Sequence, residues 1–207
     1  MQGLLVGDDQ TPPRRLEARL QDELSGPVSV LNTGTLGCSP EQYDHALVAY
    51  FDRFRPQFVV VALCANDFGV MRVEANWVET ARWLEAIAQS CRSRGVDFLA
   101  VALPLELALL GCRNESVYPA KITAIFPGSG MNYLDPIEAF AAEDLPLRAL
   151  ASREGRGDPY SLLDNRQYDD HHLLPRGYDL WARVVARRLI QLWSLPDREW
   201  RPGPSIR

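Results

Sequence analysis

The segment Asp169–Tyr178 has the sequence Asp-Asp-His-His-Leu-Leu-Pro-Arg-Gly-Tyr, in which an aspartate stands three positions before a histidine. Pro175 and Gly177 indicate that this segment begins as a loop. From such a loop the carboxylate of Asp169 can bond one ring nitrogen of His172 and leave the other nitrogen facing outward. The ordinary pKa of histidine lies near 6.5, so the segment predicts a pair of side chains suited to acid–base chemistry.

Three short polar motifs upstream each follow an apolar run. They are Gly7-Asp8-Asp9 after Leu4–Val6, Asn32-Thr33-Gly34 after Val28–Leu31, and Asn66-Asp67 after Phe58–Leu63. Short apolar runs rich in β-branched residues are typical of buried parallel strands. In an open α/β sheet, ligands bind in the crevice beyond the carboxyl ends of the strands. We therefore expect the three motifs and the Asp-x-x-His segment to converge on one place.

Helical patterns alternate with the apolar runs. Amphipathic spacing predicts helices over residues 13–24, 40–54, 76–94 and 177–193, and further strands are expected over 96–103 and around 132–135. The second helix has the clearest start, with Ser39 as N-cap, Pro40 at the first helical position and Gln42 at the reciprocal capping position. Residues 104–157 are the least regular, and 153–159 are expected as an exposed turn. The alternation predicts a parallel sheet with helices on both faces.

Taken in order, the four motifs resemble the sequence blocks of the SGNH, or GDSL-type, hydrolase family. Those blocks are Gly-Asp-Ser, Asn-x-Gly, Gly-x-Asn-Asp and Asp-x-x-His-Leu, and the resemblance extends from Gly3 to about Leu192. It implies a three-layer α/β/α sandwich with a five-stranded parallel sheet, similar to flavodoxin, in one domain over residues 1–194. A tail rich in proline and arginine follows over 195–207. Two positions depart from the family pattern: Cys64 replaces a glycine and Asp9 replaces the serine nucleophile.

The resemblance also implies an activity and a set of site residues. The family removes acyl groups from small esters, often acetyl groups on carbohydrates, without a cofactor or metal. The residues matching its site are Asp9 in the nucleophile position, Gly34 and Asn66 as oxyanion donors, Asp169 as the orienting acid and His172 as the base. Asp8, Asn32 and Asp67 are expected to brace the turns. His171 and His45 are expected to be structural or exposed.

The aspartate at position 9 determines which reactions this site can catalyse. A carboxylate needs no base, but it is a weak nucleophile toward esters, and it puts negative charge beside the oxyanion donors. Loss of most activity is one consequence, because removing a triad serine leaves only about 10³–10⁴-fold catalysis over water. A second option is covalent attack by Asp9 on an alkyl carbon, as in haloalkane dehalogenases, followed by hydrolysis by water that His172 activates. A third is direct activation of water by Asp9 and His172. Thr11 is a poor substitute nucleophile, because Pro12 follows it.

Three interpretations of the chain remain open at this point: an ester hydrolase, a non-catalytic binding or interaction domain that keeps the crevice, and an unrelated flavodoxin-like binder. Nucleotide binding is disfavoured, because Gly7-Asp8-Asp9 is not a glycine-rich phosphate-binding loop. The expected partner is therefore a small ester or an acylated carbohydrate. The sequence leaves the oligomeric state open.

Composition excludes several further classes. The 207 residues carry a net charge of −5, which disfavours general binding to nucleic acid. Cys38, Cys64, Cys91 and Cys112 are widely spaced and no cluster of histidines accompanies them, so no metal site is expected. No apolar run is long enough to cross a bilayer, and no signal-peptide pattern is visible. A cytoplasmic location is expected by default, unless an export sequence precedes Met1.

Overall fold

The computed structural model describes residues 8–35, 38–64, 67, 75–104, 126, 129–155, 163–164, 172–173 and 175–194. These residues form α-helices, strands and a short 3₁₀ helix, η1(Asp8–Gln10). The chain divides into two compact units. Unit 1 comprises Met1–Leu36, Leu103–Arg113 and Asp135–Leu192, and unit 2 comprises Gly37–Ala102, Asn114–Leu134 and Trp193–Arg207. The first strand expected, Leu4–Val6, lies outside the described residues.

Unit 2 contains a three-stranded parallel sheet in the order β1(Phe58–Leu63), β2(Asp97–Ala102) and β3(Asn132–Leu134). Phe58 pairs with Asp97 at the start of the β1–β2 ladder, and Leu63 pairs with Ala102 at its end. Residues 99 to 102 of β2 are all fully buried, so both faces of this central strand are covered. The three strands lie where the sequence predicts them, and the chain is a mixed α/β protein.

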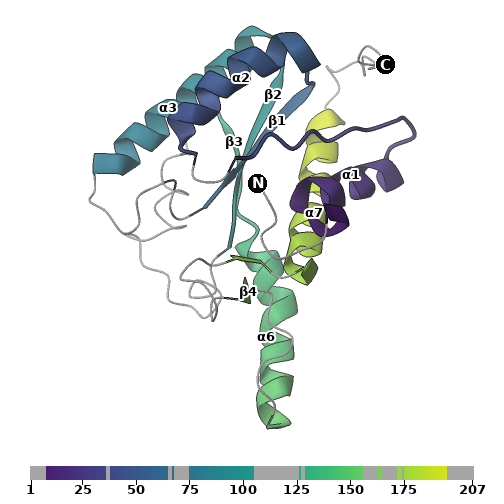
Figure 1. The fold of residues 1–207 in the computed structure, drawn as a ribbon. Helices are drawn as coiled ribbons and strands as arrows, with labels where there is room; N and C mark the ends of the chain where they lie inside the picture. The colour runs from purple at the N-terminus through teal and green to yellow at the C-terminus, as the bar shows by residue number, and fades with distance from the viewer. Residues whose placement is uncertain are drawn as a thin grey trace. The chain divides into compact units, whose positions relative to one another are not determined.

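Two helices of unit 2 accompany this sheet, α2(Pro40–Phe54) and α3(Ala75–Ser93). They pack against each other, and α3 packs on β2 (Figure 1). The predicted capping box begins α2, where the Ser39 N–H donates to the Gln42 side chain over 2.8 Å. The inward faces of both helices are those that the spacing predicts. On α3 they include Trp77, Leu84 and Cys91.

Gly95 ends α3 as the sequence predicts. Its φ of +67° is left-handed, its N–H donates to the Arg92 carbonyl over 3.1 Å, and the Val96 N–H donates to the Cys91 carbonyl over 3.0 Å. This pair of bonds is the Schellman pattern, which satisfies the last carbonyls of a helix. The glycine therefore allows the chain to leave α3 directly into β2.

Gly95→Ala is expected to lower the free energy of unfolding by about 1–2 kcal/mol through backbone strain alone, because no atom lies within 4 Å of an added Cβ. Urea unfolding measures the loss. Gly95→Asn is the matched control, since asparagine tolerates left-handed φ and should recover part of the loss. Equal losses in the two variants would contradict a conformational cause.

Unit 1 contains α1(Pro12–Glu23), α6(Ile137–Arg153), α7(Pro175–Trp193) and a short antiparallel pair, β4(Leu163–Asp164) with β5(His172–Leu173). The helix predicted over 177–193 is thus confirmed, with Tyr178, Trp181, Val185, Leu189 and Leu192 buried on one face. The helix predicted over 13–24 is also confirmed. It buries Leu16 and Leu20.

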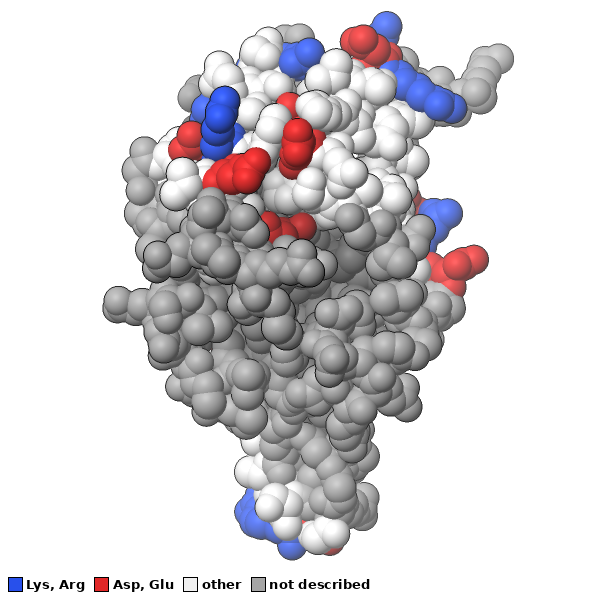
Figure 2. Space-filling model, turned by 60° about the vertical axis from the view of Figure 1, so that its left-hand side comes forward, with Lys and Arg blue, Asp and Glu red and all other residues white. Residues whose placement is uncertain are grey.

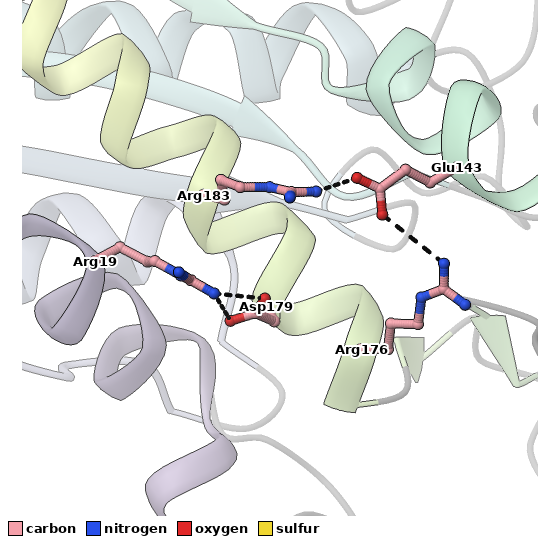
Figure 3. A network of polar contacts seen from close by, with 5 residues as sticks. All are labelled: Arg19, Glu143, Arg176, Asp179 and Arg183. Atoms are coloured by element: carbon pink, nitrogen blue, oxygen red, sulfur yellow. Dashed lines mark hydrogen bonds and ion pairs between the residues drawn. The ribbon is translucent and has the colours of Figure 1, made fainter.

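Ion pairs connect these three helices within unit 1 (Figure 3). Arg19 on α1 donates to both carboxylate oxygens of Asp179 on α7, at 2.9 and 2.8 Å. Arg183 on α7 donates to Glu143 on α6, and Arg176 lies 3.9 Å from the same carboxylate. All five side chains are partly exposed. Each pair therefore adds only about 0–1 kcal/mol to the free energy of unfolding, and its main effect is to fix which helix faces meet.

Two predictions for unit 1 are wrong. The first concerns residues 104–157, the stretch expected to be least regular: in its described part, the helix α6 spans 17 residues and buries Ile137 and Phe140. The sequence does not predict this helix because Pro146 lies inside it, and proline within a helix removes one hydrogen bond. The turn expected after it is present at Glu154 and Gly155, and residues 156–159 lie outside the described part.

The second error is the buried strand over Val28–Leu31. The structure assigns no strand to these residues, and Leu31 is 53% exposed. The Val28 N–H donates to the Gln21 side chain over 3.0 Å, and the Val30 N–H donates to the Glu17 carboxylate over 2.7 Å. Side chains of α1 therefore accept hydrogen bonds from main-chain N–H groups that the prediction assigned to pairing with a neighbouring strand.

The surface carries charges of both signs. Figure 2 shows described acidic and basic side chains lying among uncharged ones on one face, with some side chains of opposite charge next to each other. Such a mixed pattern is typical of an ordinary solvated surface. In the described part of the chain, no helix combines the length and the apolar character needed to cross a bilayer.

Candidate functional site

Asp9 lies in η1(Asp8–Gln10), directly before α1, and its side chain is exposed. The Thr11 hydroxyl donates to the Asp8 carbonyl over 2.9 Å and closes this turn. Asp8 therefore braces the turn as predicted, through its main chain. The arrangement presents the Asp9 carboxylate to solvent, where a ligand can reach it.

Gly34 is half-buried, and its N–H donates to the Asn32 side chain over 3.1 Å. Asn32 thus braces the turn after residue 31, as the sequence predicts. The same bond occupies the N–H that the family resemblance assigns to the oxyanion. Gly34 can donate to a substrate only by exchanging this partner.

His172 lies in β5, and the β4–β5 register places Asp164 opposite it. Sequence reasoning missed Asp164, because a two-residue strand has no periodicity to detect. Asn66 and Asp169, the remaining predicted site residues, lie outside the described residues. The convergence of Asp9, Gly34, Asn66, Asp169 and His172 on one cleft therefore stays a prediction.

The best-described polar cluster is centred on Asp67, just beyond the carboxyl end of β1. The Asp67 side chain accepts from the Cys64 N–H over 2.8 Å and contacts the Tyr43 hydroxyl at 2.9 Å. Its N–H donates to the Cys64 carbonyl over 3.1 Å, and its carbonyl accepts from the Thr80 hydroxyl over 2.7 Å. Asp67 therefore joins the end of β1 to α2 and α3, which confirms the prediction that it braces this turn.

Burial dominates the electrostatics of this cluster. Asp67 is only 8% exposed, and loss of solvation raises the pKa of its carboxyl above the ordinary value, while bonds from Cys64 oppose the rise. Burial and the nearby Asp67 also raise the pKa of the Tyr43 hydroxyl. Both side chains thus favour their protonated forms. The sequence analysis did not single out Tyr43, although a buried tyrosine hydroxyl generally needs a partner.

Among the described cysteines, Cys91 is the most deeply buried. Burial raises the pKa of the Cys91 thiol to about 12, so Cys91 is a core residue with almost no thiolate at neutral pH. Among the described residues, no three His, Cys, Asp or Glu side chains lie close enough together to hold a metal ion.

No protein-family model matches the chain, and the search of curated proteins finds no significant match.

Proposed function

We propose that the chain is a hydrolase of the SGNH, or GDSL, type that acts on carboxylic esters, with an activity that Asp9 impairs or alters. The substrates are small acyl esters, with acetylated carbohydrate as one candidate class. The three-layer α/β/α sandwich with a five-stranded sheet belongs to this proposal. It needs two strands beyond the three parallel strands that the described residues form.

The observation that carries the proposal is the turn after β1. The Asn-Asp motif begins three positions after Leu63, the last residue of the parallel strand β1, and Asp67 is bonded to both the N–H and the carbonyl of Cys64. Polar residues at the carboxyl ends of parallel strands are where α/β proteins bind ligands. A side-chain amide at residue 66 would then supply a fixed dipole for a developing oxyanion.

In the proposed reaction, Gly34 and Asn66 stabilise the oxyanion. His172, oriented by Asp169, acts as the general base that accepts the proton. Asp9 takes the nucleophile position. Its carboxylate has two routes. In the first, it attacks the alkyl carbon of the ester and displaces the substrate's carboxylate, and water then hydrolyses the aspartyl ester that is left. In the second, it activates water together with His172 for attack on the acyl carbon. Both routes need the exposed carboxylate that η1 presents.

A non-catalytic binding domain is the second candidate, and the bond between Gly34 and Asn32 favours it. An oxyanion donor already satisfied within the protein contributes nothing to a transition state until that bond breaks. Such a domain would bind acylated ligands without turning them over.

An ester-hydrolysis assay separates the two candidates. The parent chain and Asp9→Ser are assayed side by side on aryl esters and acetylated sugars. Turnover by either protein supports a hydrolase. If neither protein turns over any member of the panel, the hydrolase proposal is wrong, and saturable binding of the same compounds would then identify a binding domain.

The Asp–His pair has its own test. Asp169→Asn is expected to leave the fold intact and to move the titration of His172 to lower pH, because a neighbouring carboxylate stabilises the imidazolium. Proton–nitrogen NMR of the histidine rings measures this shift, with the exposed His45 as internal reference.

Two matched variants sharpen this experiment. Asp170→Asn should leave the His172 titration unchanged, because the resemblance assigns the pairing to Asp169. Asp164→Asn tests the residue that the β4–β5 register places opposite His172. If Asp164→Asn moves the titration and Asp169→Asn does not, the pair has been assigned to the wrong aspartate.

A further inference from the structure

The Tyr43 hydroxyl lies between two oxygen atoms. Its Oη is 2.9 Å from the Cys38 main-chain carbonyl and 2.9 Å from Asp67 Oδ1. A phenol has one hydrogen and can donate it fully to one of these oxygens. If Asp67 were a carboxylate, the other contact would bring two lone pairs together without a hydrogen. A second hydrogen, carried by Asp67, gives each of the two contacts a donor of its own.

The other oxygen of Asp67 already has donors. Asp67 Oδ2 accepts from the Cys64 N–H over 2.8 Å and from the Cys64 thiol over 3.3 Å. Oδ1 contacts Tyr43 Oη alone among the described side chains. The acid hydrogen consequently belongs on Oδ1, directed at Tyr43.

We infer that Asp67 is held as a neutral carboxylic acid that donates to Tyr43 Oη, while Tyr43 donates to the Cys38 carbonyl. This chain of two hydrogen bonds ties α2 and the residue before its N-cap to the turn after β1. The titratable side chains that contact Asp67 in the described part are Tyr43 from α2 and Cys64 from the end of β1. Thr80 on α3 contacts only its main chain. Burial, which raises the pKa of Asp67, acts in the same direction.

The inference has a consequence that rests on the proposed function. Asn66, the oxyanion residue of that proposal, stands directly before Asp67 in the sequence, and the Asp67 N–H bond to the Cys64 carbonyl spans residues 65 and 66. Asp67 then acts as a positioning residue for the hydrolase. Its bonds to Cys64 fix the main chain at residue 67, and a neutral side chain adds no charge there.

Infrared difference spectroscopy on the full chain tests the protonation state without any need for activity. At neutral pH, subtracting the spectrum of Asp67→Asn from that of the parent should leave the C=O band of a protonated carboxylic acid. Asp52→Asn is the matched control, because Asp52 is exposed on α2 and its removal should leave carboxylate bands instead. A carboxylate band for Asp67 would overturn the inference. Tyr43→Phe keeps the acid but removes its acceptor, so its acid band should persist at higher frequency.

The pH dependence of stability gives a second readout. A folded-state pKa above the unfolded value, which is about 3.9 for aspartate, stabilises the fold at low pH, and this contribution is lost as pH rises through the folded pKa. The melting temperature of Asp67→Asn should therefore rise relative to the parent between pH 4 and neutral pH, because an amide mimics the neutral acid at every pH. A relative fall over that range would contradict a neutral Asp67.

The positioning role is tested in the Asp9→Ser background. Asp67→Asn should retain most of the kcat on an aryl acetate, whereas Asp67→Ala should lose at least about tenfold in kcat with little change in KM. Equal kcat values for the two variants would refute the positioning role. If Asp9→Ser has no activity at all, the hydrolase proposal and the positioning role fail together, while the infrared result still decides the protonation of Asp67.

Discussion

Asp9→Ser should hydrolyse a small activated acetyl ester at least about tenfold faster than the parent, which corresponds to roughly 1.4 kcal/mol in the activation barrier. The proposed base, orienting acid and oxyanion donors are all present in the sequence, so the attacking hydroxyl is the missing part. Serine is smaller than aspartate and uncharged, and residue 9 is exposed in η1. The replacement should therefore fit the turn and remove repulsion from the oxyanion. Initial rates at several substrate concentrations measure the gain.

Asp8→Ser is the control for this experiment. Asp8 is the adjacent residue of η1, also exposed, and it braces the turn through its main-chain carbonyl, which serine retains. It should give no gain. If the parent is instead the faster enzyme and loses its activity on Asp9→Asn, aspartate is the working nucleophile or base. The hypothesis of an impaired site would then be wrong.

Phe140→Ala should lower the free energy of unfolding by about 3–5 kcal/mol, the largest stability effect expected here. The Phe140 ring on α6 is fully buried, and removing it deletes apolar contacts and leaves a cavity. Leu150→Ala is the control on the same helix. Leu150 is 39% exposed, so its loss should stay within about 1 kcal/mol. Urea unfolding followed by circular dichroism measures both, and similar losses for the two variants would show that α6 is not anchored through Phe140.

The sequence predicts those elements whose local signals agree with their burial. β1 and β2 are apolar runs bounded by turn residues, and α7 buries one continuous stripe. The sequence mispredicts two segments, because tertiary contacts determine their structure. α6 is a helix despite Pro146, since Ile137 and Phe140 hold its first turns in the core. Val28–Leu31 is strand-like in composition, but α1 supplies its hydrogen-bond partners.

The predictions for the candidate site also differ in whether they depend on local structure or on tertiary contacts. The bracing roles of Asn32 and Asp67 follow from turn chemistry, which is local, and the structure confirms both. The role of Tyr43 depends on how α2 meets the end of β1, and helical spacing cannot reveal such a meeting. The Asp–His pair depends on the segment from Asp169 to His172, for which the sequence offers a spacing but no geometry. For that reason its assignment rests on resemblance.

The bonds from α1 to the segment after it also bear on how separate copies of the chain behave. An extended stretch of valine and leucine with free N–H groups is a template onto which another molecule can add a strand. Here the Gln21 and Glu17 side chains occupy the amide hydrogens of Val28 and Val30, two positions apart in the chain. A foreign strand would have to displace both, and one of them carries a negative charge. The helix thus blocks the addition of a strand at these two positions.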